Sequence, residues 1–399
     1  MSYPHVMPIA IVTPWWSEKS TGGAEFLAHD IGRQLLRRGY RVEVLTTCGR
    51  DAFHDWTEDY FVAGAVQEDG LTIRRFSLDA RDGARFAQLY SALNHDCVLS
   101  PTEEIEFVAN SINSRSLYAF IEENHDGYGF LFLPYLYGTT YYGVRAAAER
   151  AIIIPCLHNE PIAYMQCFQE MMAAAGGLWF LSEAEYYLAR ALYPIQGVLA
   201  RVIGTGMDFC EKGDGERFRR RKGIDGPYIL FAGRRVPGKG FDLLLRCFAR
   251  FVEAHANWKL VLAGPGETIA AGQVSVANTV DLGLVEKQEL WDAMAGATVF
   301  CQPSLYESFS YVLMEAWTQG TPVLVNAQCE VLRSQCEVAG GGLWFLDEEE
   351  FECALDYFEA HPDEARQMGS QGSEYVARNC RWADVMDRAE ALLAACGFA

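Results

Sequence analysis

Short hydrophobic runs alternate with amphipathic segments along most of this chain. Residues 9–13 are apolar and are followed by a polar loop, an apolar pattern of helical period over 26–36 and a second apolar run at 41–46. This order of strand, loop, helix and strand predicts the opening of a doubly wound parallel sheet. The same alternation starts again at residue 228. The pattern therefore predicts an α/β protein built from two doubly wound, Rossmann-like domains.

The length of 399 residues also favours two domains, because a single core rarely grows so large. Gly204, Thr205 and Gly206 interrupt the pattern and are typical of a hinge. We expect an N-terminal domain over residues 1–205 and a C-terminal domain over 206–381. The amphipathic residues 382–399 are expected to pack back on the first domain. Residues 51–125 receive no function, although 71–76 is typical of a strand.

Charge and composition exclude several classes of partner. The net charge is −20 and both halves of the chain are acidic, which disfavours nucleic acid and anionic membranes. No stretch approaches the ~20 apolar residues of a membrane span, so we expect a cytoplasmic protein without an integral membrane segment. The twelve cysteines form no Cys-x-x-Cys pair and lie largely in apolar runs, which indicates buried thiols rather than a metal site.

Two stretches of the second half carry candidate chemistry. Glu315 lies inside an apolar helical pattern, and Glu307 precedes that helix, whose free N–H groups attract anions. The segment RRVPGKG, residues 234–240, follows a predicted strand and combines basic side chains with glycines, as a pyrophosphate site requires. A core helix with one acid reaching solvent is the alternative interpretation of the first stretch.

The first half offers three further candidates. Gly22 and Gly23 precede a predicted helix, where backbone N–H groups can approach a phosphate, and His158 follows a predicted strand. The segment PYLYGTTYYG, residues 134–143, is predicted to be a loop that forms the acceptor wall. Its tyrosines supply both stacking faces and hydroxyl groups: Tyr135, Tyr137, Tyr141 and Tyr142. A tight turn, a structural histidine and ordinary packing are the respective alternatives.

In this order, these motifs resemble the retaining glycosyltransferases of family 4, the glycosyl transferases group 1 with GT-B architecture. The resemblance covers nearly the whole chain. The strings that carry it are GGAE at 22–25, LHNEP at 157–161, IGTGMD at 203–208, AGRRVPGKG at 232–240, LVLAGPG at 260–266 and PSLYESFSYVLMEAWTQGTPVLV at 303–325.

The resemblance implies two domains that face each other across a cleft, an acceptor-side domain first and a nucleotide-sugar-binding domain second. Arg234 and Lys239 would hold the donor pyrophosphate beside the loop of Gly22 and Gly23, and His158 would reach a sugar hydroxyl. The remaining donor contacts that it implies are Glu307 and the backbone of Ser308, Phe309 and Ser310 on the sugar and phosphate, Glu315 on the ribose, and Leu284 near the base.

The implied activity is metal-independent transfer of a hexose from a nucleoside diphosphate sugar, with UDP favoured over GDP, to a hydroxyl of a sugar or small-molecule acceptor. Configuration is retained, no cofactor is needed, and His158, Arg234, Lys239 and Glu307 are the catalytic candidates. A nucleotide-sugar hydrolase or epimerase, and a non-catalytic nucleotide-sugar-binding subunit, are the alternatives. The chain departs from the family at Ser310, where glycine is usual.

Overall fold

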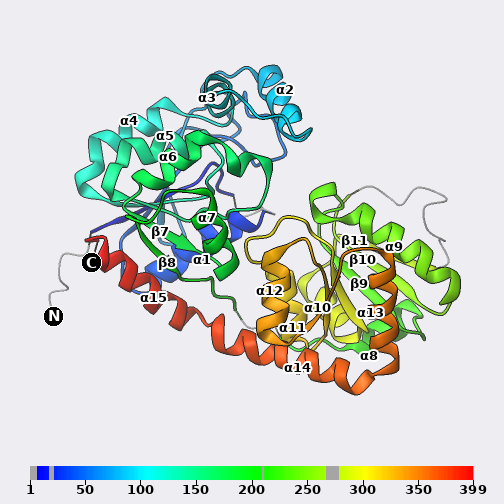
Figure 1. Ribbon diagram of the computed structural model, residues 1–399. Helices are drawn as coiled ribbons and strands as arrows, with labels where there is room; N and C mark the ends of the chain where they lie inside the picture. Colours follow the sequence, from blue (N-terminus) through cyan, green and yellow to red (C-terminus); the bar gives the residue numbers. More distant parts are fainter. Residues whose placement is uncertain (1–6, 18–21, 209–210, 267–277, 399) are drawn as a thin grey trace. The chain divides into compact units, whose positions relative to one another are not determined.

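The computed structural model describes residues 7–17, 22–208, 211–266 and 278–398. The chain divides into two compact units, which are residues 1–205 together with 382–399 (unit 1) and residues 206–381 (unit 2). Each unit contains a mostly or wholly parallel sheet with helices on its faces (Figure 1). This confirms the predicted α/β class with two doubly wound domains.

In the part of unit 1 that the structure describes, the sheet has eight strands, and all neighbouring pairs are parallel except the edge hairpin of β3 and β4. Every residue of the central strands β1 and β5 is buried, which explains their continuous apolar sequences. In spatial order the strands are β3 (Gly64–Glu68), β4 (Leu71–Phe76), β2 (Val42–Thr47), β1 (Ile9–Val12), β5 (Gly129–Phe132), β6 (Ala151–Ile153), β7 (Gly177–Phe180) and β8 (Leu199–Val202).

The helices of unit 1 bury their apolar faces against this sheet and against one another. They are α1 (Gly23–Arg37), α2 (Gly83–Leu93), α3 (Pro101–Ala109), α4 (Arg115–Asn124), α5 (Gly138–Ala147), α6 (Gln166–Ala174), α7 (Glu183–Leu192) and α15 (Trp382–Ala395), with 3-10 turns at His125–Gly127, Ala148–Arg150 and Pro161–Tyr164. Residues 51–125, predicted mainly as loops or an insertion, thus contribute β3 and the helices α2, α3 and α4.

Helix α15 returns from unit 2 to complete unit 1. Arg38, the C-cap residue of α1, donates hydrogen bonds to Asp387 at 2.7 Å and to Glu390 at 2.9 Å. Beyond the helix, Phe398 packs on Gly129 of β5, where a Cβ atom would lie 2.4 Å from the ring. The close approach therefore requires glycine at position 129.

Unit 2 has a six-stranded parallel sheet with the order β11 (Thr279–Gly283), β10 (Lys259–Ala263), β9 (Tyr228–Ala232), β12 (Val299–Gln302), β13 (Val323–Asn326) and β14 (Gly342–Phe345). Its helices are α8 (Gly215–Lys222), α9 (Phe241–Ala254), α10 (Lys287–Gly296), α11 (Tyr311–Thr318), α12 (Glu330–Ala339), α13 (Glu348–Ala360) and α14 (Pro362–Asn379), with a 3-10 turn at Pro237–Lys239. Helices α9 and α13 share a core with the strands through aromatic and leucine side chains, including Phe251, Phe351 and Leu355.

Among the described helices, none combines the length and the apolar character needed to cross a bilayer. The cysteines in the described ranges are free thiols, and most of them are buried.

Candidate functional site

The strand order of unit 2 reverses between β9 and β12, and open α/β sheets bind ligands at the carboxyl ends of the strands at such a point. Two loops begin there, residues 234–239 after β9 (the basic loop) and residues 303–310 after β12 (the acidic loop). Leu305 N donates a hydrogen bond to Gly238 O at 3.1 Å. Gly240 has φ +67°, and a Cβ atom there would lie 1.9 Å from Pro303 O. Glycine at 240 therefore allows the two loops to pack together.

Lys239 of the basic loop and Glu307 of the acidic loop form a close ion pair. Lys239 Nζ lies 2.5 Å from Glu307 Oε1, and both side chains are largely buried. Gln302 Nε2 donates to the same carboxylate oxygen at 2.9 Å and to Ser304 Oγ at 2.9 Å. The pair joins two residues that the sequence selected separately, whereas sequence reasoning missed Gln302. Its only sequence signal is that it ends an apolar strand directly before the acidic loop.

The two adjacent arginines of the basic loop have different environments. Arg235 is buried, and both terminal nitrogens of its guanidinium donate hydrogen bonds to the carboxylate of Asp281 on β11. The distance from Arg235 Nη1 to Asp281 Oδ2 is 2.7 Å. Hydrogen bonds from Arg235 lower the pKa of the Asp281 carboxyl, although partial burial opposes this shift. Arg235 therefore anchors the basic loop to the neighbouring strand. Arg234 is half-buried and stays the predicted pyrophosphate ligand.

Glu315 occupies the half-buried face of α11, as its apolar sequence context suggested. Desolvation raises the pKa of its carboxyl, while the charge of Lys287 and the nearby indole N–H of Trp291 lower it. Lys287 and Trp291 both belong to α10, so the charge and the indole that act on this carboxylate come from one neighbouring helix. Leu284 precedes α10 and is 82% exposed, which makes it an apolar surface available to a ligand.

Residues 308–310 lead into α11. Ser308 is half-buried, whereas the Phe309 ring is buried and contacts Tyr311 edge to face at 5.4 Å. Ser310 is the N-cap residue of α11 and has φ +80° and ψ +88°. Its backbone thus lies in the left-handed region that favours glycine, the residue usual at this position in the family that the chain resembles. Within the described residues, its buried Oγ has no hydrogen-bond partner.

We expect Ser310→Gly to raise the free energy of unfolding by about 1 kcal/mol. Glycine removes the cost of a left-handed L residue, about 1–2 kcal/mol, and the buried hydroxyl, although it adds entropy to the unfolded chain. Urea denaturation measures the change. Ser310→Ala is the matched control, because it removes only the hydroxyl. A Gly variant no more stable than the Ala variant would contradict a strained backbone.

In unit 1, Gly22 is the N-cap residue of α1 and Gly23 is its first helical residue. Gly22 N donates to Glu25 Oε2 at 3.1 Å, and Glu25 is buried. The carboxylate of Glu25 therefore already accepts a hydrogen bond from one of the backbone N–H groups that were predicted to approach a phosphate. Gly23 is exposed, and a Cβ atom there would meet nothing within 4 Å.

His158 lies after β6, the second neighbour of β1 in the sheet, and its side chain is 31% exposed. Its Nδ1 lies 3.6 Å from Glu160 Oε1, and the hydroxyl of Tyr135 donates to the same oxygen at 3.1 Å. Glu160 is thereby held between a buried tyrosine and the histidine. This arrangement favours Nδ1–H directed toward Glu160.

Glu185 of α7 is a fully buried carboxylate behind this histidine. It accepts the backbone N–H of Leu157 at 2.6 Å and that of Leu181 at 2.5 Å. Burial raises the pKa of the Glu185 carboxyl to about 7, against the effect of these hydrogen bonds and of His158. Because Leu157 precedes His158 directly, Glu185 fixes the backbone that carries the histidine. Neither Glu160 nor Glu185 was predicted from the sequence.

The structure corrects the predicted tyrosine wall. The segment 134–143 is not all loop, since α5 begins at Gly138 and includes Tyr141 and Tyr142. Tyr135 and Tyr141 have no exposed surface and belong to the core of unit 1, so neither can contact an acceptor in this structure. Tyr142 is half-buried on α5. Tyr137 is half-buried and contacts Trp15 at 4.9 Å and Trp56 at 5.9 Å between ring centroids.

Part of the chain is similar in sequence to known glycosyltransferases. Residues 214–375 match the family Glycosyl transferases group 1. An uncharacterized glycosyltransferase of Methanocaldococcus jannaschii is 38% identical over 118 residues, which are 28% of this chain and 30% of that protein. A D-inositol 3-phosphate glycosyltransferase of Acidothermus cellulolyticus is 33% identical over 152 residues, which are 33% of this chain and 34% of that protein. The matched part thus spans about a third of the length of these relatives.

Solved structures match over nearly the whole chain. Sucrose-phosphate synthase of Thermosynechococcus elongatus has a TM-score of 0.70 at 17% identity and covers 96% of this chain and 98% of its own. The Anabaena protein HepE, in complex with UDP-glucose, has a TM-score of 0.69 at 16% identity and covers 97% of this chain and 100% of its own. At this identity the likeness shows the fold, which is the GT-B architecture of two Rossmann-like domains.

Proposed function

We propose, on the premise that residues 214–375 form a Glycosyl transferases group 1 domain, that this protein transfers a sugar from a nucleoside diphosphate sugar to an acceptor hydroxyl. The observation that carries the proposal is the pairing of Lys239 with Glu307 at the strand-order reversal of unit 2. A cation and a carboxylate side by side suit a ligand with an anionic diphosphate next to a sugar rich in hydroxyl groups.

Binding of the donor would reorganise this pair. The ammonium group of Lys239 would form its ion pair with the diphosphate instead of Glu307, and Arg234 would add a second cation. Glu307 would then be released to accept hydrogen bonds from the sugar, while the Gln302 amide continues to orient it. Unit 2 thus supplies electrostatic stabilisation of the leaving group from side chains alone, and we propose that transfer is metal-independent.

The nucleoside would occupy the surface between Leu284 and Glu315. A leucine that is 82% exposed gains by covering its apolar surface with a base, and a half-buried carboxylate suits a pair of ribose hydroxyls. The likeness of the fold to a protein that binds UDP-glucose supports UDP as the donor nucleotide.

On the side of unit 1, His158 is proposed to contact a hydroxyl of the transferred sugar. The acceptor is proposed to be a sugar or another small molecule that packs on Tyr137 and the adjacent Trp56, because aromatic faces suit sugar rings. We further propose that configuration is retained by a front-face path, in which the departing phosphate helps to deprotonate the acceptor hydroxyl. This last step rests on the family resemblance.

A thermal-shift screen of nucleotides and nucleotide sugars tests the donor first. UDP and UDP-sugars at a hundred times their dissociation constant should add about 2.7 kcal/mol of stability. Glu315→Gln should weaken the response to UDP, whereas Glu286→Gln, a change at the exposed cap of α10, should not. A panel in which no nucleotide shifts the transition would contradict the donor site.

Product analysis separates the remaining candidates. With a UDP-sugar and a mixture of sugar acceptors, a transferase releases UDP and forms a new glycoside whose anomeric configuration can be read by NMR. Sugar released equally fast without an acceptor would indicate a hydrolase, and a changed sugar still bound to UDP would indicate an epimerase. Nucleotide binding without either product would favour a non-catalytic subunit. Activity that survives EDTA supports the metal-independent path.

A further inference from the structure

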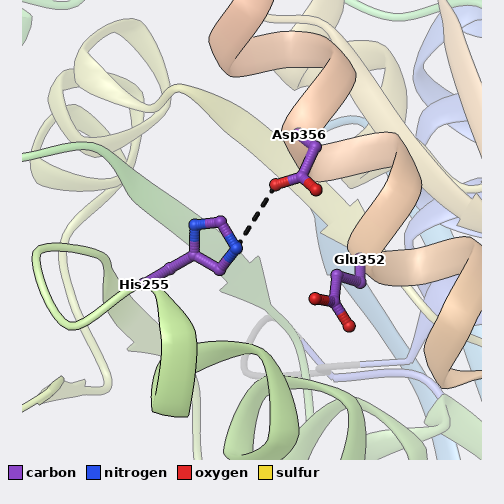
Figure 2. A group of neighbouring side chains, drawn as sticks. All are labelled: His255, Glu352 and Asp356. Carbon is purple, nitrogen blue, oxygen red and sulfur yellow. Dashed lines mark ion pairs between the residues drawn. The ribbon is translucent and has the colours of Figure 1, made fainter.

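A group of side chains on unit 2, outside the proposed donor site, has the composition of a metal-ion site. His255 follows the C-terminus of α9, and Glu352 and Asp356 lie one turn apart on α13 (Figure 2). Each of the three offers one ligand atom, and these atoms all lie within 4.8 Å of one another. Among the described residues, no other group of three histidine, cysteine or carboxylate side chains brings its ligand atoms this close together.

We propose that His255, Glu352 and Asp356 bind a divalent first-row transition-metal ion, for which Zn²⁺ is the best fit. One imidazole nitrogen and two carboxylate oxygens are a ligand set that Zn²⁺ accepts, with a fourth position left to water. His255 Nε2 and Asp356 Oδ1 are 3.3 Å apart. Two ligands at ~2.05 Å from one tetrahedral ion are separated by about 3.3 Å. The ligand atom of Glu352 lies within 4.8 Å of the other two, so binding of the ion would draw this carboxylate closer.

The surroundings hold His255 ready to coordinate through Nε2. Its ring stacks on Phe251 at 4.1 Å with an angle of 10° between the planes. Its Nδ1 lies 4.0 Å from Glu359 Oε2, and the indole of Trp258 donates to the same oxygen at 3.3 Å. A carboxylate on the far side of a metal-binding histidine usually orients its ring. At 4.0 Å the separation exceeds a hydrogen bond, so Glu359 acts on the His255 ring through its charge. Glu359 is therefore a positioning residue for this site.

A competing cation does not block the proposed ligands. Arg250 lies 3.8 Å from Glu352 through its Nε, but its guanidinium also reaches Glu348 at 3.9 Å and Glu349 at 3.7 Å. Release of Glu352 therefore leaves Arg250 with two acidic neighbours. The metal would join α9 to α13 at the end of α9 opposite to Lys239. The inference is independent of the proposed sugar transfer, because none of its residues belongs to the donor site.

The test uses the full chain with Cys353→Ser as the parent, since this exposed thiol adjoins Glu352 and could itself bind zinc. Calorimetric titration with Zn²⁺ should show one saturable site, and Zn²⁺ should raise the melting temperature. His255→Gln should raise the dissociation constant at least tenfold and abolish the thermal shift, and Glu359→Gln should raise it about tenfold. Co²⁺ should give visible absorption bands in the parent that His255→Gln loses.

His361→Gln is the matched control. His361 is also stacked on an aromatic ring, Tyr357, and lies 3.4 Å from a carboxylate, Glu364, but the described residues place no third ligand beside it. This variant should bind Zn²⁺ as the parent does. If His255→Gln melts below the parent in EDTA, the exposed Asp356→Asn replaces it as the test variant. The proposal is overturned if the parent shows no saturable site, or if both ligand variants bind zinc as tightly as the parent.

Discussion

Lys239→Ala should lower the rate of sugar transfer by about 10²–10³-fold, the usual effect of removing one group that stabilises developing charge. The side chain stands 2.5 Å from Glu307 in the unliganded protein and is the proposed cation for the diphosphate. Its loss removes that cation. Glu307, which is largely buried, then keeps the neutral amide of Gln302 as its hydrogen-bond donor among the described residues. Release of nucleoside diphosphate under saturating donor measures the effect.

Arg246→Ala is the control for charge and folding. Arg246 lies on the exposed face of α9, the helix that follows the basic loop. Its guanidinium makes a loose ion pair with Glu348 at 3.7 Å. It should keep the parental rate. Because Lys239→Ala can also weaken the packing of the two loops, its melting temperature and its affinity for UDP should be measured together. A fully folded Lys239→Ala protein with near-normal turnover would remove the donor-site assignment.

The second large effect is expected at Glu185, on the pH dependence of stability. The carboxyl of the unfolded chain titrates near 4.5 and that of the folded chain near 7. Between these values the folded protein holds a proton that the unfolded chain has lost. The contribution to stability is therefore complete below pH ~4.5 and is lost as the pH rises through 7, by about 3 kcal/mol in total. Glu185→Gln removes the titrating group and should abolish this decline.

Urea denaturation of both proteins between pH 5 and 8 checks this prediction, with hydrogen exchange at the Leu157 and Leu181 amides as a local probe of unit 1. These amides are the two donors to Glu185, so their protection should fall in parallel with stability. Glu183→Gln, a change at an exposed residue two positions before Glu185 on α7, should leave the decline intact. Identical pH profiles for the parent and Glu185→Gln would show that the buried carboxyl does not titrate in this range.

The fold and the candidate donor loops could be predicted because their signals are local. Central parallel strands such as β1 are buried on both faces and therefore read as apolar runs, and glycines mark the loops at the strand-order reversal. The edge strand β3 gave no such signal, since four of its five residues are exposed. The tyrosine segment was misassigned for a different reason. It directly follows a buried strand and was interpreted as a loop throughout, although Gly138 starts α5.

The partners of the site residues could not be predicted, because they are distant in sequence. Asp281 decides that Arg235 rather than Arg234 becomes the buried anchor, and nothing in the basic loop itself distinguishes the two. Likewise Glu185 resembles its neighbours in an amphipathic helix until the structure brings Leu157 to it. Residue type and spacing select candidate chemistry, whereas tertiary contacts decide which member of a pair remains available to a ligand.

Helix α15 has a consequence for how the protein is made. Unit 1 contains residues from both sides of unit 2, and Phe398 fills the space over Gly129 in one of its central strands. At ~5–20 residues per second, the ribosome delivers α15 roughly ten seconds or more after the rest of that unit. During this interval the apolar surface of β5 around Gly129 is not yet covered by Phe398. Nascent chains should therefore recruit chaperones until α15 and Phe398 have emerged from the ribosome. Joining residues 382–398 directly behind residue 205 would remove the delay.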